Sequence, residues 1–235
     1  MVPDTAYLYD WECRHVLGRG DQDLPFWLDL VAGSAGPVLE LACGTGRITV
    51  PVARSGQAIV GLDRDPVMLA ALHRRRAGDR WPLTLAADMR HFALAARFGA
   101  IFVAYNSLQL LADTDEMAAC LACARRHMAP GGVVGVEVTD FQAGGADGAA
   151  GAVDEVLAHA AGIGLSGRLV HDLAARTSSY RRRFSGPGWV FDDQVVLRST
   201  GPAELDAIVG AAGLRVMTRW VDGPVTRIVA SSVQA

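Results

Sequence analysis

Residues 38–48, VLELACGTGRI, carry the pattern that decides the fold. The first part is an apolar run typical of a strand buried on both faces, and only Glu40 interrupts it. The run breaks at Gly44-Thr45-Gly46, and a helical pattern follows. A strand, a glycine turn and a helix in this order direct backbone N–H groups and a helix N-terminus at a ligand. The segment therefore predicts a ligand site, and the rest of the chain narrows the choice of ligand.

The composition limits the class of protein. The chain has 235 residues, enough for one α/β domain with a large core. No apolar run approaches the roughly 18 residues of a membrane helix, and residues 1–10 lack the pattern of a signal peptide. The formal net charge of −3 argues against broad binding to nucleic acid. We therefore expect a cytoplasmic enzyme with no membrane or nucleic-acid partner; a homodimer is compatible with the sequence, but no pattern tests it.

The basic residues and the cysteines exclude several chemistries. All 22 residues counted as Lys+Arg are Arg, which removes Schiff-base catalysis and the phosphate-binding lysine of the Walker loop. Cys120 and Cys123 form a C-x-x-C pair inside a helical pattern, but no second ligand pair accompanies them. We interpret them as small buried residues and predict no metal site. Cys43 is likewise read as a small residue and not as a nucleophile.

Strand-like and helix-like segments alternate along the first 140 residues. Predicted strands cover 38–43, 58–62, 83–87, 100–104 and 133–138, and predicted helices cover 21–31, 47–54, 65–77 and 115–128. This alternation predicts a doubly wound, mostly parallel sheet, in which ligands bind at the carboxyl ends of the strands. Polar residues follow four of the predicted strands: Asp63, Asp88, Asn106 and Asp140.

The pattern changes after Asp140. Residues 142–151 are rich in Gly and Ala and are predicted to form a mobile loop. Segments 165–174, 177–184 and 190–198 look like strands without intervening helices, so we expect a small antiparallel β cover. A helix at 203–212 and a hairpin of 215–221 with 226–233 follow.

We therefore predict one α/β domain with a seven-stranded Rossmann-like sheet that ends in an antiparallel hairpin. Residues 1–36 are expected to form an N-terminal lid and helix, and 37–140 the cofactor-binding core. Residues 141–200 are expected to form the cover on the substrate side, and 201–235 the closing helix and hairpin.

Two cofactors compete for the glycine turn. The dinucleotide fingerprint G-x-G-x-x-G requires a third glycine, where this chain has Thr49. Asp63, at the second strand end, can bind a ribose diol in either case and does not discriminate. An acid at the third strand end, Asp88, is not needed by dinucleotide folds and disfavours a nicotinamide-dependent oxidoreductase.

Five motifs in order resemble the class I S-adenosylmethionine-dependent methyltransferases, over nearly the whole chain. They are ELACGTGR (40–47), GLDRDPVML (61–69), AADMR (86–90), YNSLQLL (105–111) and APGG (129–132). The resemblance is to the subgroup that methylates small molecules, such as aminosugars in natural-product pathways. It implies S-adenosylmethionine as cofactor, no metal, and methyl transfer by in-line displacement to an N, O or activated C acceptor. A fold that binds the cofactor without turnover is the remaining alternative.

The resemblance also implies which residues bind the cofactor. Backbone groups of the glycine turn should approach the methionine moiety: Ala42, Cys43, Gly44 and Gly46. Asp63 should accept both ribose hydroxyls, with Arg64 beside it. Asp88 should accept the adenine amino group.

Further roles around the cofactor follow from the same resemblance. Met89 should pack on the adenine ring, and Glu40 should order the turn or reach the cofactor's amino group through water. Tyr105 should line the pocket near the sulfonium, and Tyr9 should close over the cofactor. Arg47 can pair with the cofactor carboxylate or, equally, form a surface pair at the start of a helix.

The acceptor side is less specific. Candidate general bases are His15, Asp140 and His171, each of which is as easily structural. Candidate acceptor-binding residues are Trp11, Asn106, Gln109 and Tyr180. Arg181, Arg182 and Arg183 are interpreted as a solvated strand edge, with a clamp for an acidic acceptor as the alternative.

Overall fold

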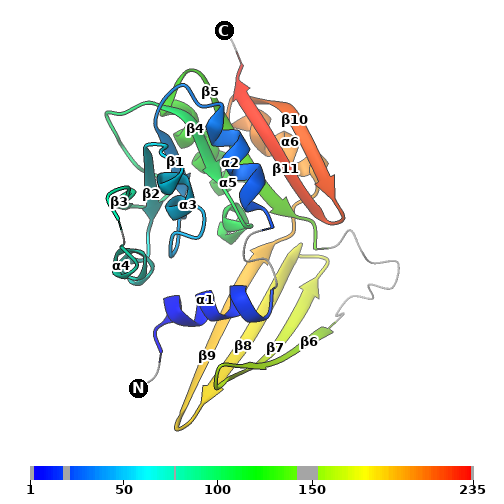
Figure 1. Ribbon diagram of the computed structural model, residues 1–235. Helices are drawn as coiled ribbons and strands as arrows, with labels where there is room; N and C mark the ends of the chain where they lie inside the picture. Colours follow the sequence, from blue (N-terminus) through cyan, green and yellow to red (C-terminus); the bar gives the residue numbers. More distant parts are fainter. Residues whose placement is uncertain (1–2, 18–21, 77, 142–152, 234–235) are drawn as a thin grey trace.

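The computed structural model describes residues 3–17, 22–76, 78–141 and 153–233 (Figure 1). The loop predicted at 142–151 lies outside the described residues. Seven strands form the main sheet in the order β10-β11-β5-β4-β1-β2-β3. Their bounds are β1 Val38–Leu41, β2 Ile59–Asp63, β3 Leu83–Ala86, β4 Phe98–Val103, β5 Met128–Thr139, β10 Leu214–Asp222 and β11 Val225–Ser232.

The pairing confirms the predicted fold class. β1 pairs in parallel with both β2 and β4, and β3 and β5 extend the parallel part on either side. β11 runs antiparallel to β5 and to β10, so the chain ends in the predicted antiparallel hairpin. The strand order reverses beside β1, which places the turn after β1 where open α/β sheets bind ligands.

Helices cover both faces of the main sheet. Ala100 and Phe102 of β4 pack against Trp27 of α2 (Leu24–Ala32) on one face. Ile101 and Val103 point to the other face, which is covered by α5 (Thr114–Arg126) and α6 (Pro202–Ala211). The remaining helices are α1 (Thr5–His15), α3 (Thr49–Arg54), α4 (Pro66–Arg74) and the 3-10 turn η1 (Ser107–Leu110). This two-sided burial explains why β4 has an uninterrupted apolar sequence.

A second sheet of four antiparallel strands forms the cover. Its order is β6-β7-β8-β9, with bounds β6 Val153–Ala160, β7 Ile163–Asp172, β8 Thr177–Gly186 and β9 Trp189–Arg198. Leu8 and Trp11 of α1 pack on this sheet together with Leu165 and Phe184. Helix α1 also contacts α4 of the core, and Figure 1 shows it lying across the small sheet.

The structure differs from the sequence prediction in several details. The cover has four strands instead of three, because β6 mixes Ala and charged residues and was not separable from the preceding loop. Residues 5–15 form a helix, and α2 begins at Leu24 instead of Asp21. Asp23, a residue type expected to cap a helix, precedes α2 but does not cap it with its side chain. Arg181–Arg183 do not lie on a strand edge, since β8 is flanked by β7 and β9.

Candidate active site

A cavity of about 250 Å³ opens at the carboxyl ends of β1, β2 and β3. Helix α1 contributes Tyr9 to its wall, and η1 contributes Ser107 and Leu110. Seven of the predicted cofactor residues line this cavity: Tyr9, Ala42, Gly44, Asp63, Arg64, Asp88 and Met89. Ala42 and Asp88 are 46 positions apart in the sequence. Residues from three strand ends nevertheless meet at one edge of the sheet, as parallel topology requires.

The turn after β1 is built from left-handed backbone. Gly44 has φ +55° and Gly46 has φ +84°, and Ala42 holds φ 56° without being a glycine. A Cβ on Gly46 would lie 2.9 Å from Leu72, whereas nothing lies within 4 Å of a Cβ position on Gly44. Gly46 is therefore needed for packing, and Gly44 for the backbone conformation at the cavity wall. Residues in strained backbone conformations cluster at binding sites. The turn after β1 is therefore a candidate binding site for an extended polar ligand.

Asp63 fixes this turn from the end of β2. Its Oδ2 accepts the N–H of Gly44 at 2.7 Å, and its Oδ1 accepts the N–H of Asp65 at 2.8 Å. Burial raises the pKa of the Asp63 carboxyl, and the two backbone N–H groups only partly offset this. Each carboxylate oxygen keeps a second lone pair for a ligand, so Asp63 can hold the turn and a diol together.

Asp88 is held by an arginine that the sequence analysis did not single out. The guanidinium of Arg90 donates to both carboxylate oxygens of Asp88, with Nη2–Oδ2 at 2.7 Å, and also pairs with Glu116 of α5. Hydrogen bonds from Arg90 lower the pKa of Asp88 to about 2. The carboxylate that lines the cavity is therefore ionised throughout the physiological range.

Glu40 lies in the sheet behind the turn and not in the cavity wall. It is buried, and its Oε2 accepts the hydroxyl of Thr49 at the start of α3. Burial raises the pKa of Glu40 to about 8. Cys43 is also buried beside Gly61, and burial raises the pKa of its thiol, in keeping with a packing role.

The Glu40 carboxyl predicts a pH effect on stability. The pKa of this carboxyl is about 8 in the folded chain and near 4.5 in the unfolded chain. Between these two pH values, Glu40 is protonated in the folded chain and ionised in the unfolded chain. Stability is then expected to fall as the pH rises from about 5 to about 8, by at most about 1.4 kcal/mol per pH unit. Glu40→Gln should show a smaller decline. Urea unfolding at pH 6 and pH 8 measures the decline in stability of the parent and of Glu40→Gln. Equal declines would show that Glu40 is not the group responsible.

Arg47 forms a buried ion pair instead of a surface pair. Its Nη1 and Nη2 donate to the two carboxylate oxygens of Asp23 at 2.5 and 2.8 Å. Asp23 also accepts the indole N–H of Trp27 at 3.1 Å, which is why it does not cap α2. Burial opposes ionisation, but the hydrogen bonds and charge of Arg47 leave the pKa of Asp23 lowered. The guanidinium lies over the ring of Tyr105, 5.0 Å from its centroid.

Tyr105 and Asn106 end β4 in a second strained segment. Their φ angles are 53° and 60°, so both residues adopt the left-handed conformation beside the cavity. Burial raises the pKa of Tyr9, with further contributions from Cys13 and Tyr105 nearby. The two tyrosines therefore lie near each other, although only Tyr9 lines the cavity.

Helix α1 is fastened to the core over the cavity. Asp10 accepts the hydroxyl of Thr45 at 2.6 Å and pairs with Arg75, while Asp4 pairs with Arg74 at 2.9 Å. Thr45 belongs to the glycine turn itself, so Asp10 joins the helix to the residues that should hold the cofactor. These pairings could not be found from sequence, because nothing predicted that α1 would lie against α4.

Removing the Asp10 contact is expected to release the cofactor faster. Asp10→Ala deletes a hydrogen bond and an ion pair that hold α1 over the cavity, so we expect the dissociation rate to rise by about tenfold. Asp4→Ala removes only an exposed pair and should change the rate little. Stopped-flow release of S-adenosylhomocysteine measures both rates, and equal effects of the two variants would contradict a role for Asp10.

The three candidate bases lie on three different elements of the structure. His15 is exposed at the end of α1, with its ring 5.5 Å from Trp11. His171 lies on β7 and shares a hydrogen bond with the hydroxyl of Ser178 at 2.8 Å. Asp140 follows β5 and accepts the hydroxyl of Ser199 at 2.8 Å. None of the three lines the cavity.

The candidate acceptor residues divide into two groups. Gln109 is 1% exposed; its amide accepts the N–H of Thr139 and donates to the carbonyls of Thr139 and Arg198. Trp11 is 3% exposed, and its indole N–H donates to the carbonyl of Ala160 at 3.0 Å. These two residues therefore join structural elements instead of facing an acceptor.

The other two acceptor candidates keep polar groups available. Asn106 accepts the hydroxyl of Thr139 at 2.8 Å, which leaves its amide N–H groups as donors. Among the described residues, the buried hydroxyl of Tyr180 forms no hydrogen bond of ordinary geometry, but it lies near the Glu12 carboxylate; burial and the charge of Glu12 raise its pKa. The hydroxyl can therefore donate to Glu12 or to a ligand.

A buried ion pair that the sequence analysis missed joins α1 to the cover. Arg182 of β8 pairs with Glu12 of α1 and with Asp193 of β9, and its guanidinium lies 5.5 Å from the ring centroid of Tyr180. Arg182 therefore differs from its two neighbours, which point to the opposite face of the sheet. The alternating strand geometry, not the run of three arginines, decides its environment.

Comparison with known proteins identifies the family of the chain. A family model described as "Methyltransferase domain" matches residues 38–132. Over 223 residues the chain is 32% identical to dTDP-3-amino-3,4,6-trideoxy-alpha-D-glucopyranose N,N-dimethyltransferase of Streptomyces venezuelae, which covers 91% of each chain. The solved structure of the CcbJ methyltransferase from Streptomyces caelestis matches with a TM-score of 0.80 and 25% identity, covering 92% of this chain and 90% of the other. DesVI from Streptomyces venezuelae matches with a TM-score of 0.79 and 24% identity, covering 99% and 100%.

The chain belongs to the class I S-adenosylmethionine-dependent methyltransferases. It is an enzyme that transfers a methyl group from S-adenosylmethionine to a small-molecule acceptor. The nicotinamide-dependent alternative is thereby set aside. In the part of the chain that the structure describes, no helix could span a membrane, and no group of three or more His, Cys, Asp or Glu could hold a metal ion.

Proposed function

We propose that this enzyme methylates the amino group of a nucleotide-linked amino sugar. The observation that carries the proposal is the match to a sugar N,N-dimethyltransferase over 91% of both chains, which includes the cover as well as the core. A shared core alone would support only methyl transfer, because acceptor choice depends on residues outside the cofactor cavity.

The lining of the cavity supports an amine acceptor. The described residues of the wall include three aspartates and no histidine, so no group with an ordinary pKa near neutrality faces the cavity. A neutral amine needs no general base before it attacks a sulfonium methyl, whereas a hydroxyl gains from one. Alignment and exclusion of water then supply most of the rate, and alignment alone can contribute about 7–11 kcal/mol.

We assign the cofactor contacts to the cavity wall. Asp63 accepts the ribose hydroxyls, and Asp88 accepts the adenine amino group while Met89 packs on the ring. The turn at 42–46 holds the methionine end, with Arg64 and Glu40 in support. When bound, S-adenosylmethionine supplies the activated methyl group at this edge of the sheet.

We assign the acceptor side to Asn106 and Tyr180. Asn106 of the core keeps its amide N–H groups as donors, and Tyr180 of the cover has a hydroxyl that can donate to a ligand. Asp140 and His171 remain proposals as proton acceptors after transfer; because neither lines the cavity, His171→Ala should leave cofactor binding unchanged.

The proposal is tested with dTDP-linked 3-amino and 3-hydroxy sugars and methyl-labelled cofactor. Mass spectrometry should find one or two added methyl groups on the amino sugar and none on the hydroxy sugar. Transfer to the hydroxy sugar alone, or to neither, would contradict the proposed acceptor. A homodimer and a cytoplasmic location also stay predictions; light scattering tests the first and cell fractionation the second.

A further inference from the structure

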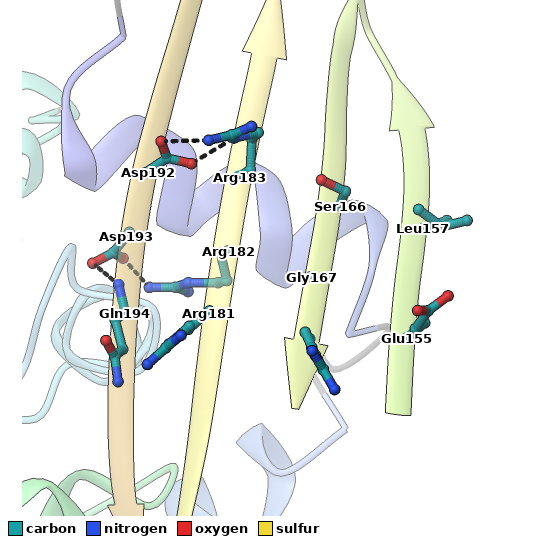
Figure 2. A pocket seen from close by; sticks show the side chains of 11 residues that line it. Glu155, Leu157, Ser166, Gly167, Arg181, Arg182, Arg183, Asp192, Asp193 and Gln194 are labelled. Atoms are coloured by element: carbon teal, nitrogen blue, oxygen red, sulfur yellow. Dashed lines mark hydrogen bonds and ion pairs between the residues drawn. The ribbon is translucent and has the colours of Figure 1, made fainter. Parts of the chain in front are cut away.

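The outer face of the four-stranded sheet carries a group of exposed arginines. Arg168 of β7 and Arg181 of β8 stand directly opposite each other in register, and Arg183 follows two residues further along β8. All three are exposed and lie along one cavity of about 710 Å³. Figure 2 shows Arg181 and Arg183 on this face with α1 behind the strands, and Arg168 shares the face because it stands directly opposite Arg181.

Two of these arginines are not neutralised. Arg183 donates to both carboxylate oxygens of Asp192, with Nε–Oδ1 at 2.7 Å. Among the described residues, neither Arg168 nor Arg181 forms an ion pair, although Glu155 stands opposite Arg168 in register. Like charges directly opposite on neighbouring strands repel and destabilise the sheet. An anion placed between Arg168 and Arg181 would relieve that repulsion.

We propose that this face binds the phosphate or diphosphate group of a small molecule, at a site distinct from the active site. Two guanidinium groups match the charge and the fork geometry of a phosphate oxygen pair. The hydroxyl of Ser166 and the amide of Gln194 line the same cavity and can donate to the remaining oxygens (Figure 2). Leu157, 78% exposed in the same wall, offers an apolar surface to the organic part of the ester.

Charge on this face disfavours two other occupants. Glu155 and Asp192 flank the arginines on β6 and β9, which limits the positive surface to the size of a small anion and not of a nucleic acid. A two-fold interface whose axis passed between Arg168 and Arg181 would bring the central arginines of both copies together. Neither a nucleic acid nor a second copy of the chain would neutralise Arg168 and Arg181 as a phosphate would.

The test is calorimetric titration of the full chain with sodium pyrophosphate and, separately, with uridine diphosphate at low salt. Saturable binding of both is expected, and Arg168→Gln/Arg181→Gln should weaken it by at least about tenfold. The matched control is Arg54→Gln/Arg97→Gln, which removes two exposed arginines elsewhere and should bind as the parent does. Cofactor binding should be unchanged in all variants, which shows that they are folded.

Three results would overturn the proposal. They are no saturable binding of either probe, equal loss in the two double variants, and a dimer that dissociates in light scattering when Arg168 and Arg181 are replaced. A peptide of glutamates that binds this face when pyrophosphate does not would point to an acidic protein partner and would also overturn it. Under the proposed function, uridine diphosphate can also occupy the acceptor site, and the loss in Arg168→Gln/Arg181→Gln separates the two sites.

Discussion

Replacing Asp63 with alanine is expected to weaken S-adenosylmethionine binding by about 100-fold or more, because two charge-assisted hydrogen bonds to the ribose are lost. The substitution also removes the acceptor for the Gly44 N–H, so the strained turn loses its support at the same time. Calorimetric titration of the variant with the cofactor measures the effect. The fold should survive, because Asp63 caps no helix and belongs to a sheet whose hydrogen bonds remain.

Another helix-capping aspartate provides the matched control. Asp113 caps α5, where its Oδ1 accepts the N–H of Glu116 at 2.8 Å, and it does not line the cavity. Asp113→Ala should therefore lower stability by about 1 kcal/mol and leave cofactor affinity nearly unchanged. Binding of Asp63→Ala at the parent's affinity, or an equal loss in Asp113→Ala, would show that the ribose contact is wrongly assigned.

Replacing Arg182 with alanine is expected to be the most destabilising change among the arginines of the cover. Glu12 would be left with a 2% exposed side chain and no cation, and breaking such a buried pair costs about 3–5 kcal/mol. For a chain of this size each kcal/mol shifts the melting temperature by about 2–4 °C, so a drop of about 6–20 °C is expected. Differential scanning calorimetry measures it.

Arg183, the adjacent residue, provides a control because it carries the same charge as Arg182 but is exposed. Arg183 pairs with Asp192, but the two side chains are 62% and 61% exposed. Arg183→Ala removes the same charge from the same strand and should cost at most about 1 kcal/mol. If the two variants melt at the same temperature, the pair of Arg182 with Glu12 does not stabilise the protein as inferred.

The meeting of the candidate cofactor residues at one cavity could be predicted from sequence because topology fixes it. Once the strands are parallel, Gly44, Asp63 and Asp88 must meet at one edge, whatever the details of packing. The motif residues Glu40 and Cys43 were placed in the correct segment, but a strand alternates its faces, and these two side chains point into the core. Segment and residue type were therefore predictable, whereas side-chain direction was not.

The contacts that join the parts of the molecule could not be predicted. Asp23 has the position of a helix cap, and only the fold brings Arg47 and Trp27 to it. Gln109 has the type and position of an acceptor-binding residue, but its amide matches the backbone of β5 and β9 and is used there. A single sequence does not reveal which distant residue completes such a pair.

The position of α1 has a consequence for how the chain is made. The indole of Trp11 bonds to a carbonyl 149 positions later, and Glu12 pairs with an arginine 170 positions later. At a synthesis rate of about 5–20 residues per second, the helix leaves the ribosome roughly 10–30 s before these partners exist. During that time its apolar face, with Leu8 and Trp11, lacks its partners and is available to chaperones.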